Sequence, residues 1–195
     1  SIPVENGNHI NPSTMGMSIA YSPFFFAVHY PLIWMGYPAT GFSQPYRIAI
    51  ILACLFYVIF ALFLLRKVLI RVFSDKVTAV ALLAVILATN LFYYIVYEPG
   101  MTHAFNFSFG VYFLYFTMKW HEKPGVWSSI GLGLLTGIIS LIRPTDVVVA
   151  LVCILWKVDT SNTLKNNLLL FMKKWHLILT IIFFAFLVWV PQFLY

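Results

Sequence analysis

The sequence predicts an all-helical membrane protein, a polytopic bundle of about six spanning helices preceded by an interfacial helical segment. Two observations on composition support this fold class. The chain is 62% hydrophobic and only 9% charged, whereas soluble domains carry about 25% charged residues. Its Lys and Arg residues fall in short clusters between apolar runs, which is typical of cytoplasmic loops. The net charge of +6 is therefore interpreted as loop charge, and nucleic-acid binding is excluded.

Six hydrophobic runs are the candidate spans. A helix needs about 20 residues to cross the hydrocarbon core of a bilayer. The candidate spans are residues 48–65, 77–97, 101–118, 126–142, 144–156 and 177–195. The fifth run is short, and we expect it to form a hairpin with the fourth, bent at Arg143-Pro144. In the fourth run, Ser129, Gly133 and Gly137 recur at a spacing that favours close helix contact.

Residues 1–46 differ from the bundle of residues 47–195. Between Asn6 and Tyr46 there is no Lys, Arg, Asp or Glu, and Pro23, Pro31, Pro38 and Pro45 interrupt the stretch at near-regular intervals. Proline disrupts a straight helix, so we interpret residues 17–35 as one or two short interfacial helices, with a kinked spanning helix as the alternative. The chain begins with Ser1 and stops within an apolar run. We expect it to be part of a longer polypeptide and inactive by itself.

The basic residues set the predicted orientation. Ten of the twelve lie in three loops that alternate with the spans, and two lie on the other side. The positive-inside rule makes the ten-residue side cytoplasmic, as in a bacterial inner membrane. The residues of that side are Arg66, Lys67, Arg71, Lys76, Lys119, Lys123, Lys157, Lys165, Lys173 and Lys174.

The outer side then carries the candidate chemistry. Glu98, His103, Arg143 and Asp146 are expected at one level, at the outer ends of four helices. The cytoplasmic loops are short and contain no glycine-rich phosphate loop. Any reaction should therefore take place at the outer face, where Glu5 also lies if residues 1–46 are interfacial.

Arg143 is the leading candidate for binding an anion. A permanent cation at the end of an apolar span is costly unless it is paired or reaches the membrane surface. Beside a helix that begins at Pro144, a guanidinium suits a phosphate or pyrophosphate group. The alternative is an internal Arg143–Asp146 pair that only closes the hairpin.

Glu98 and His103 flank a turn at Pro99-Gly100. The carboxylate could serve as a general base or metal ligand, and the imidazole could bind phosphate. The alternative is a hydrated interfacial loop in which neither side chain has a role.

Four stretches resemble a known family. They are residues 12–26 (PSTMGM to PFFF), residues 41–46 (GFSQPY), residues 99–105 (PGMTHAF) and residues 131–146, which end in LIRPTD. In this order and spacing they are similar to lipid-dependent glycosyltransferases of the GT-C superfamily, in the branch of protein mannosyltransferases and aminoarabinose transferases. The family's hairpin commonly has Asn where Asp146 stands.

The resemblance implies an enzyme that moves a sugar from a polyprenyl-phosphate donor to a lipid, glycan or protein on the periplasmic face. Arg143 and His103 would hold the donor phosphate, with Asp146 beside them. The family's catalytic acid lies in an outer loop that corresponds to sequence before Ser1, unless Glu5 is part of it, and Glu98 is a second candidate. A divalent metal ion is the one cofactor that the resemblance allows.

Two other classes remain open. A transporter or lipid flippase would place charges near the bilayer midplane and show internal repeats, and the sequence has neither. A non-enzymatic membrane subunit is the third possibility, and membrane lipids would be its binding partners.

Overall fold

The protein is a helical assembly, seen here in a computed structural model that describes residues 2–3, 9–10 and 14–194. A two-residue antiparallel strand pair precedes the helices, with Ile2 opposite Ile10. In chain order the elements are β1 (Ile2–Pro3), β2 (His9–Ile10), α1 (Gly16–Trp34), α2 (Gln44–Leu69), α3 (Asp75–Leu87), α4 (Leu91–Val96), α5 (Thr102–Glu122), α6 (Val126–Ile142), the 3-10 helix η1 (Pro144–Val149), α7 (Ala150–Ile154), α8 (Ser161–Lys173) and α9 (Trp175–Leu194).

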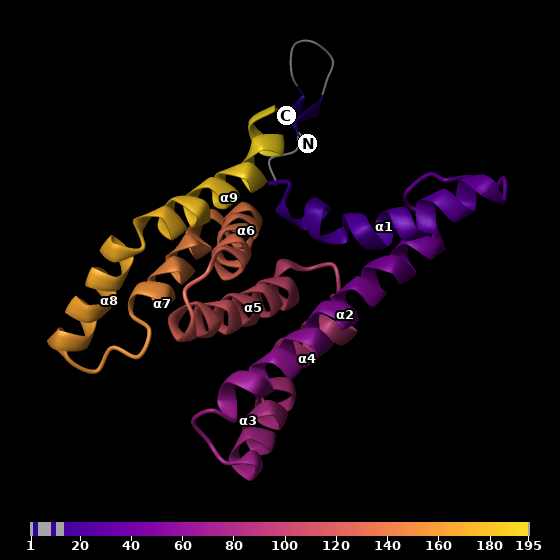
Figure 1. Cartoon of the computed structure of the whole chain (residues 1–195). Helices are drawn as coiled ribbons and strands as arrows, with labels where there is room; N and C mark the ends of the chain where they lie inside the picture. The colour runs from indigo at the N-terminus through magenta and orange to yellow at the C-terminus, as the bar shows by residue number, and fades with distance from the viewer. Residues whose placement is uncertain (1, 4–8, 11–13, 195) are drawn as a thin grey trace.

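Four helices form a row that organises the molecule. Figure 1 shows α5 and α6 lying between α2 and α9, while α1 crosses the upper end of the row and α3 lies beside the lower half of α2. Helix α5 lies in the interior of the row, and its Phe105, Phe113 and Trp120 are almost fully buried. Small residues of α2, Ala53 and Ala61, let that helix approach them closely.

Two of the described helices are long and apolar enough to cross a membrane, α2 and α9. Of the six expected spans, the first and the last therefore have the length and composition of spanning helices. The fourth run forms α6 over the predicted residues, Val126–Ile142, but with 17 residues it is shorter. The helical fold class is thus confirmed, whereas the full set of six spans stays a prediction.

The second expected span, residues 77–97, is wrong as a single helix. The first helix, α3, ends at Leu87 after 13 residues, and a second helix, α4, of 6 residues begins at Leu91. Thirteen residues rise only about 20 Å, against about 30 Å of hydrocarbon. The break is stabilised by Thr89, whose hydroxyl donates to the carbonyl of Val85 (2.6 Å) and accepts from the N–H of Leu91 (3.1 Å). A threonine hydroxyl can compete with the helical backbone in this way.

Residues 17–35 form one helix, not two. Helix α1 runs through Pro23 and Pro31 without ending, and it closes at Gly36, whose φ of 71° suits glycine. Its start is fixed against α6, because a Cβ on Gly16 would lie 2.4 Å from the backbone nitrogen of Ile142. The structure therefore ties α1 to the bundle at the level of the expected hairpin.

Helix α8, Ser161–Lys173, is not among the helices predicted from the sequence. Its first turn is capped by Thr160 and Thr163, each of which accepts from the other's backbone N–H, an arrangement that satisfies donors left free at a helix start. The hydroxyl of Thr163 also donates to Asp159 and lowers the pKa of that carboxyl. The short segment α7 precedes it, and Asn167 of α8 donates to the carbonyls of Ile154 and Trp156.

Helices α6 and α9 share the most extensive interface in the fold, and the close helix contact predicted at the small residues is confirmed, with two of them against α9. A Cβ on Gly133 would lie 2.5 Å from the carbonyl oxygen of Ile181, and one on Gly137 would lie 2.7 Å from that of Ala185. Ser129 faces α5 instead, where its hydroxyl accepts from the indole of Trp120 at 2.9 Å.

Candidate functional site

The hairpin between α6 and η1 forms where the sequence predicts it. Arg143 ends α6 in an extended conformation and donates its N–H to Ile139. Pro144 then opens η1, and the N–H of Asp146 returns to the carbonyl of Arg143 at 2.9 Å. Because the backbone turns at once after Arg143, the guanidinium is left exposed at the end of α6.

Asp146 is held by α5 and not by Arg143. The amide of Asn106 donates to its Oδ2 at 2.6 Å, and the hydroxyl of Thr145 donates to its Oδ1 at 3.2 Å. The ion pairs of residues 14–194 are Arg66–Asp75, Arg71–Glu122 and Lys119–Glu122. The alternative of an internal Arg143–Asp146 pair therefore does not describe this hairpin.

Asn106 is the site residue that sequence reasoning missed. Its other amide atom, Oδ1, is buried and accepts no hydrogen bond within the described structure. The contact with Asp146 fixes the amide orientation, since a carboxylate accepts and the nitrogen donates. A buried acceptor without a donor costs about 1–3 kcal/mol. A hydroxyl or water reaching this oxygen would remove that cost. The available signal was an asparagine within an aromatic helix, three residues after His103.

Glu98 and His103 form a second group with the aromatic residues of α4. The hydroxyl of Tyr93 donates to Glu98 over 3.4 Å. The ring of His103 stacks on Tyr94, with 4.2 Å between centroids. Helix α1 reaches the same turn, where Tyr21 donates to the carbonyl of Gly100 at 2.7 Å.

The two groups are joined through α5. His103 and Asn106 are three residues apart on one helix, so their side chains lie on the same face, and Asn106 reaches Asp146. The structure thus brings Asp146 to the first turns of α5, as expected for one common end. It records no direct contact between Glu98 and Arg143 among the described residues. Glu5, the remaining predicted site residue, lies outside them.

Comparison of the chain with protein-family models, with curated proteins and with solved structures gave no match. For a metal ion, the described residues offer no group of three His, Cys, Asp or Glu side chains.

An apolar groove begins beside the hairpin. Its first part, about 230 Å³, lies between α6, η1 and α9 and includes Val147, the residue after Asp146. Its second part, about 480 Å³, continues between α5, α6, α7, α8 and α9 as far as Leu168 and Phe171. The two parts share Thr136, Ala185 and Phe186. The groove therefore extends from the Arg143 hairpin along α9 toward the other end of the bundle.

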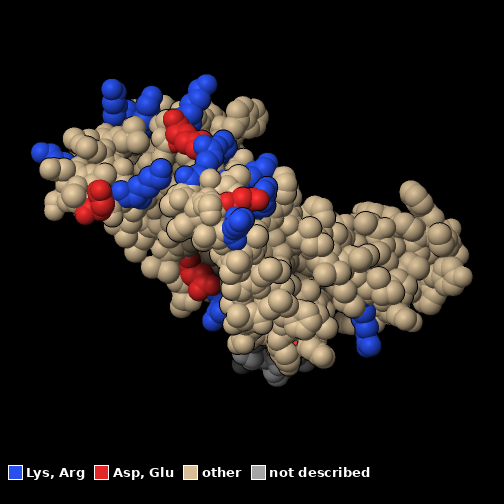
Figure 2. All heavy atoms as spheres, turned by 90° about the horizontal axis from the view of Figure 1, so that it is seen from below, with Lys and Arg blue, Asp and Glu red and all other residues tan. Residues whose placement is uncertain are grey.

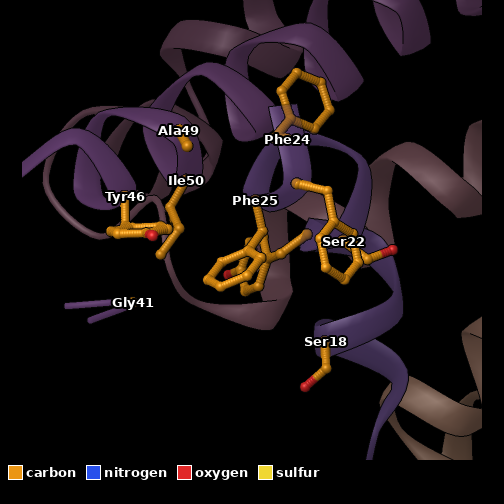
Figure 3. A pocket seen from close by; sticks show the side chains of 10 residues that line it. Ser18, Ser22, Phe24, Phe25, Gly41, Tyr46, Ala49 and Ile50 are labelled. Carbon is orange, nitrogen blue, oxygen red and sulfur yellow. The ribbon is translucent and has the colours of Figure 1, made fainter. Parts of the chain in front are cut away.

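A separate aromatic cavity of about 330 Å³ lies between α1 and α2. Figure 3 shows the rings of Phe25 and Tyr46 meeting across it, with 5.0 Å between centroids. His29 fixes the Tyr46 hydroxyl through a hydrogen bond of 2.7 Å. The lining contains no charged side chain, so this cavity suits an apolar or aromatic group.

Asn106→Ala tests the link between α5 and the hairpin. The change leaves half-buried Asp146 with only Thr145 as a side-chain donor, but it also removes the unsatisfied Oδ1 of Asn106, so we expect the free energy of unfolding to fall by only about 1 kcal/mol. Denaturant titration in detergent micelles, followed by circular dichroism, measures this loss. Asn162→Ala, at an exposed position of α8, is the control and should change stability little. Equal stability of the two variants would contradict the structural role of the Asn106–Asp146 bond.

Proposed function

We propose that this chain belongs to a membrane glycosyltransferase that takes a polyprenyl-phosphate sugar as donor and acts at the outer face of a bacterial inner membrane. The observation that carries the proposal is the continuity of the apolar groove with the Arg143 hairpin. A polyprenyl-phosphate donor is an amphiphile, and it needs a cation for its phosphate next to an apolar path for its tail. Arg143 and the groove that starts at Val147 supply both within a few residues.

The expected chemistry is a displacement at the sugar's anomeric carbon. The acceptor hydroxyl attacks that carbon, the bond from carbon to phosphate oxygen breaks, and the polyprenyl phosphate leaves. Arg143 is placed to stabilise the charge that develops on the leaving phosphate. The acceptor's proton passes to a carboxylate, for which Glu98 is the candidate among the described residues and Glu5 a further one. Asp146, held by Asn106, would position the hairpin.

The proposal includes an orientation in the membrane, with the basic end of the bundle on the cytoplasmic side. The three basic loops meet at the end of the bundle away from Arg143, since Arg71, Glu122 and Lys157 line one cavity there. Figure 2 shows most Lys and Arg side chains gathered over one end of the molecule. With that end cytoplasmic, the Arg143 hairpin faces outward, where lipid-linked sugars of this kind would be met.

Donor binding tests the proposal. We expect the protein in nanodiscs to bind a polyprenyl-phosphate sugar, and Arg143→Ala to weaken this binding at least about tenfold, because a charge-assisted contact to phosphate is lost. Arg47→Ala is the matched control: it removes the other cation outside the basic end, near the start of α2. Calorimetric titration gives the dissociation constants. Equal binding by all three proteins, or binding by none, would overturn the donor-site proposal.

A lipid flippase is the second candidate, and the length of the groove favours it. The groove runs beside α9, from Val147 of η1 at one end to Leu168 of α8 at the other. A groove of this length could guide a lipid along much of the bundle. Movement of a fluorescent polyprenyl phosphate between the leaflets of a vesicle, without transfer of any sugar, would favour the flippase over the transferase.

A further inference from the structure

A second polar cavity, of about 500 Å³, lies at the basic end of the bundle between α2, α5, α8 and the segment that follows α7. Its polar lining comes from four segments that are far apart in the sequence. Residues from the end of α2 and the turn after it, the end of α5, the segment after α7 and the first half of α8 surround it: Val68, Arg71, Val72, Met118, His121, Glu122, Trp156, Lys157, Thr163 and Asn167.

The cavity carries an excess of positive charge. Glu122 is shared by two cations, Arg71 at 3.2 Å and Lys119 at 3.3 Å. Lys157 also lines the cavity and is in none of the ion pairs recorded for residues 14–194. The lining therefore holds two cations, Arg71 and Lys157, and one carboxylate, Glu122, and this excess of positive charge favours an anion.

Lys157 is held there at a conformational cost. Among the described non-glycine residues it alone has a positive φ, 52°, which disfavours a residue with a Cβ. The backbone is fixed from both sides: Asn167 binds the carbonyls of Ile154 and Trp156, and the N–H of Val158 donates to Leu155. Glycine is the usual residue where a helix ends in this conformation, so a lysine there indicates a use for its ammonium group.

The other polar groups of the cavity are already engaged within the protein. His121 donates through Nε2 to the carbonyl of Cys153 at 2.8 Å, and Thr163 bonds Thr160 and Asp159. The cationic donors left for a ligand are the ammonium group of Lys157 and the N–H groups of Arg71 that do not bind Glu122. The remaining walls, formed by Val68, Val72, Met118 and Trp156, are apolar.

We propose that this cavity binds the phosphate group of an anionic lipid headgroup, with Lys157 and Arg71 as its ligands and the apolar walls against the lipid's glycerol and upper acyl carbons. A phosphate suits paired cations of this kind, and basic pockets between helices at a membrane surface are known to take such headgroups. The site is at the opposite end from Arg143 and does not depend on the transferase proposal.

Native mass spectrometry of the protein in detergent tests the site, with phosphatidylglycerol and phosphatidylcholine as probes and sodium phosphate as a third. The wild type should retain phosphatidylglycerol in preference to phosphatidylcholine. Lys157→Gln and Arg71→Gln should each reduce phosphatidylglycerol binding about tenfold. Lys76→Gln is the matched control, since it removes an exposed basic residue of α3 that does not line the cavity.

Lys157→Gly separates binding from folding. Glycine accepts the positive φ without strain. The midpoint of thermal unfolding of Lys157→Gly should therefore be equal to or above that of the wild type, while its binding of phosphatidylglycerol is lost. Sodium phosphate alone could raise the midpoint of thermal unfolding of the wild type, with no effect on Lys157→Gln and no effect of either lipid. In that case the site binds a free phosphate and not a headgroup. If neither source binds, or if Lys76→Gln loses as much binding as Lys157→Gln, the phosphate site is overturned.

Discussion

Replacing Gly137 with leucine is expected to separate α9 from α6 and to lower the free energy of unfolding by about 3 kcal/mol or more. A Cβ at this position would already lie 2.7 Å from the carbonyl oxygen of Ala185 and 2.8 Å from the Cβ of Val188. Both obstacles are fixed, one of them backbone, so the helices must move apart. Overpacking of this kind costs about 1–3 kcal/mol for small insertions, and leucine adds more atoms than alanine.

The same movement should break the hydrogen bond between Trp189 and Ser140, which is 3.0 Å long and lies one turn further along the interface. Unfolding by denaturant in detergent micelles, with tryptophan fluorescence and circular dichroism as signals, measures the loss. Gly110→Ala is the control, because a Cβ there meets nothing within 4 Å and alanine favours a helix interior over glycine by about 0.5–1 kcal/mol. A Gly137→Leu protein as stable as Gly110→Ala would contradict the close α6–α9 contact.

Under the proposed transferase function, Arg143→Ala is expected to reduce sugar transfer by a factor of about 10²–10³, while membrane insertion stays intact. Removal of one group that stabilises the charge of the transition state has an effect of this size. The guanidinium is exposed and outside the ion pairs of the described residues, so its loss should leave the hairpin folded. Transfer is measured in reconstituted vesicles, and protease protection of the loops checks insertion.

Arg143→Lys refines this result. Lysine keeps the charge but not the two parallel donors that suit a phosphate, so its transfer rate should lie between those of the wild type and Arg143→Ala. Normal transfer by Arg143→Ala would show that the residue has no part in the reaction. A loss of insertion in both variants would assign Arg143 to folding.

Local sequence determined the hairpin and the strongest helices. Pro144 has no N–H and cannot continue α6, so the bend at Arg143-Pro144 follows from the residue itself. The run from Val126 to Ile142 predicted α6 to the residue, because Gly125 precedes it and Arg143-Pro144 follows it. The length and apolar composition of α2 and α9 likewise followed from the sequence.

The break between α3 and α4 was not predicted. Residues 77–97 are apolar except for Thr78, Thr89 and Asn90, and an average hydropathy over the run does not show that a hydroxyl replaces helical hydrogen bonds. Thr89 does so only because the chain turns there to place α4 against α5. The composition of this run therefore predicted a span that its backbone does not form.

The candidate sites depended on tertiary structure in the same way. Asn106 and Asp146 are 40 residues apart, and the bond between them exists only because α5 lies beside η1. Arg71 and Lys157 come from two different loops, which the sequence assigned only to the same side of the membrane, and the folded chain places both in one cavity. Residue type and proline placement act over a few neighbours, so they determined helix positions and charge distribution. Which side chains meet is decided by helix packing, where glycines such as Gly137 set the distance between backbones.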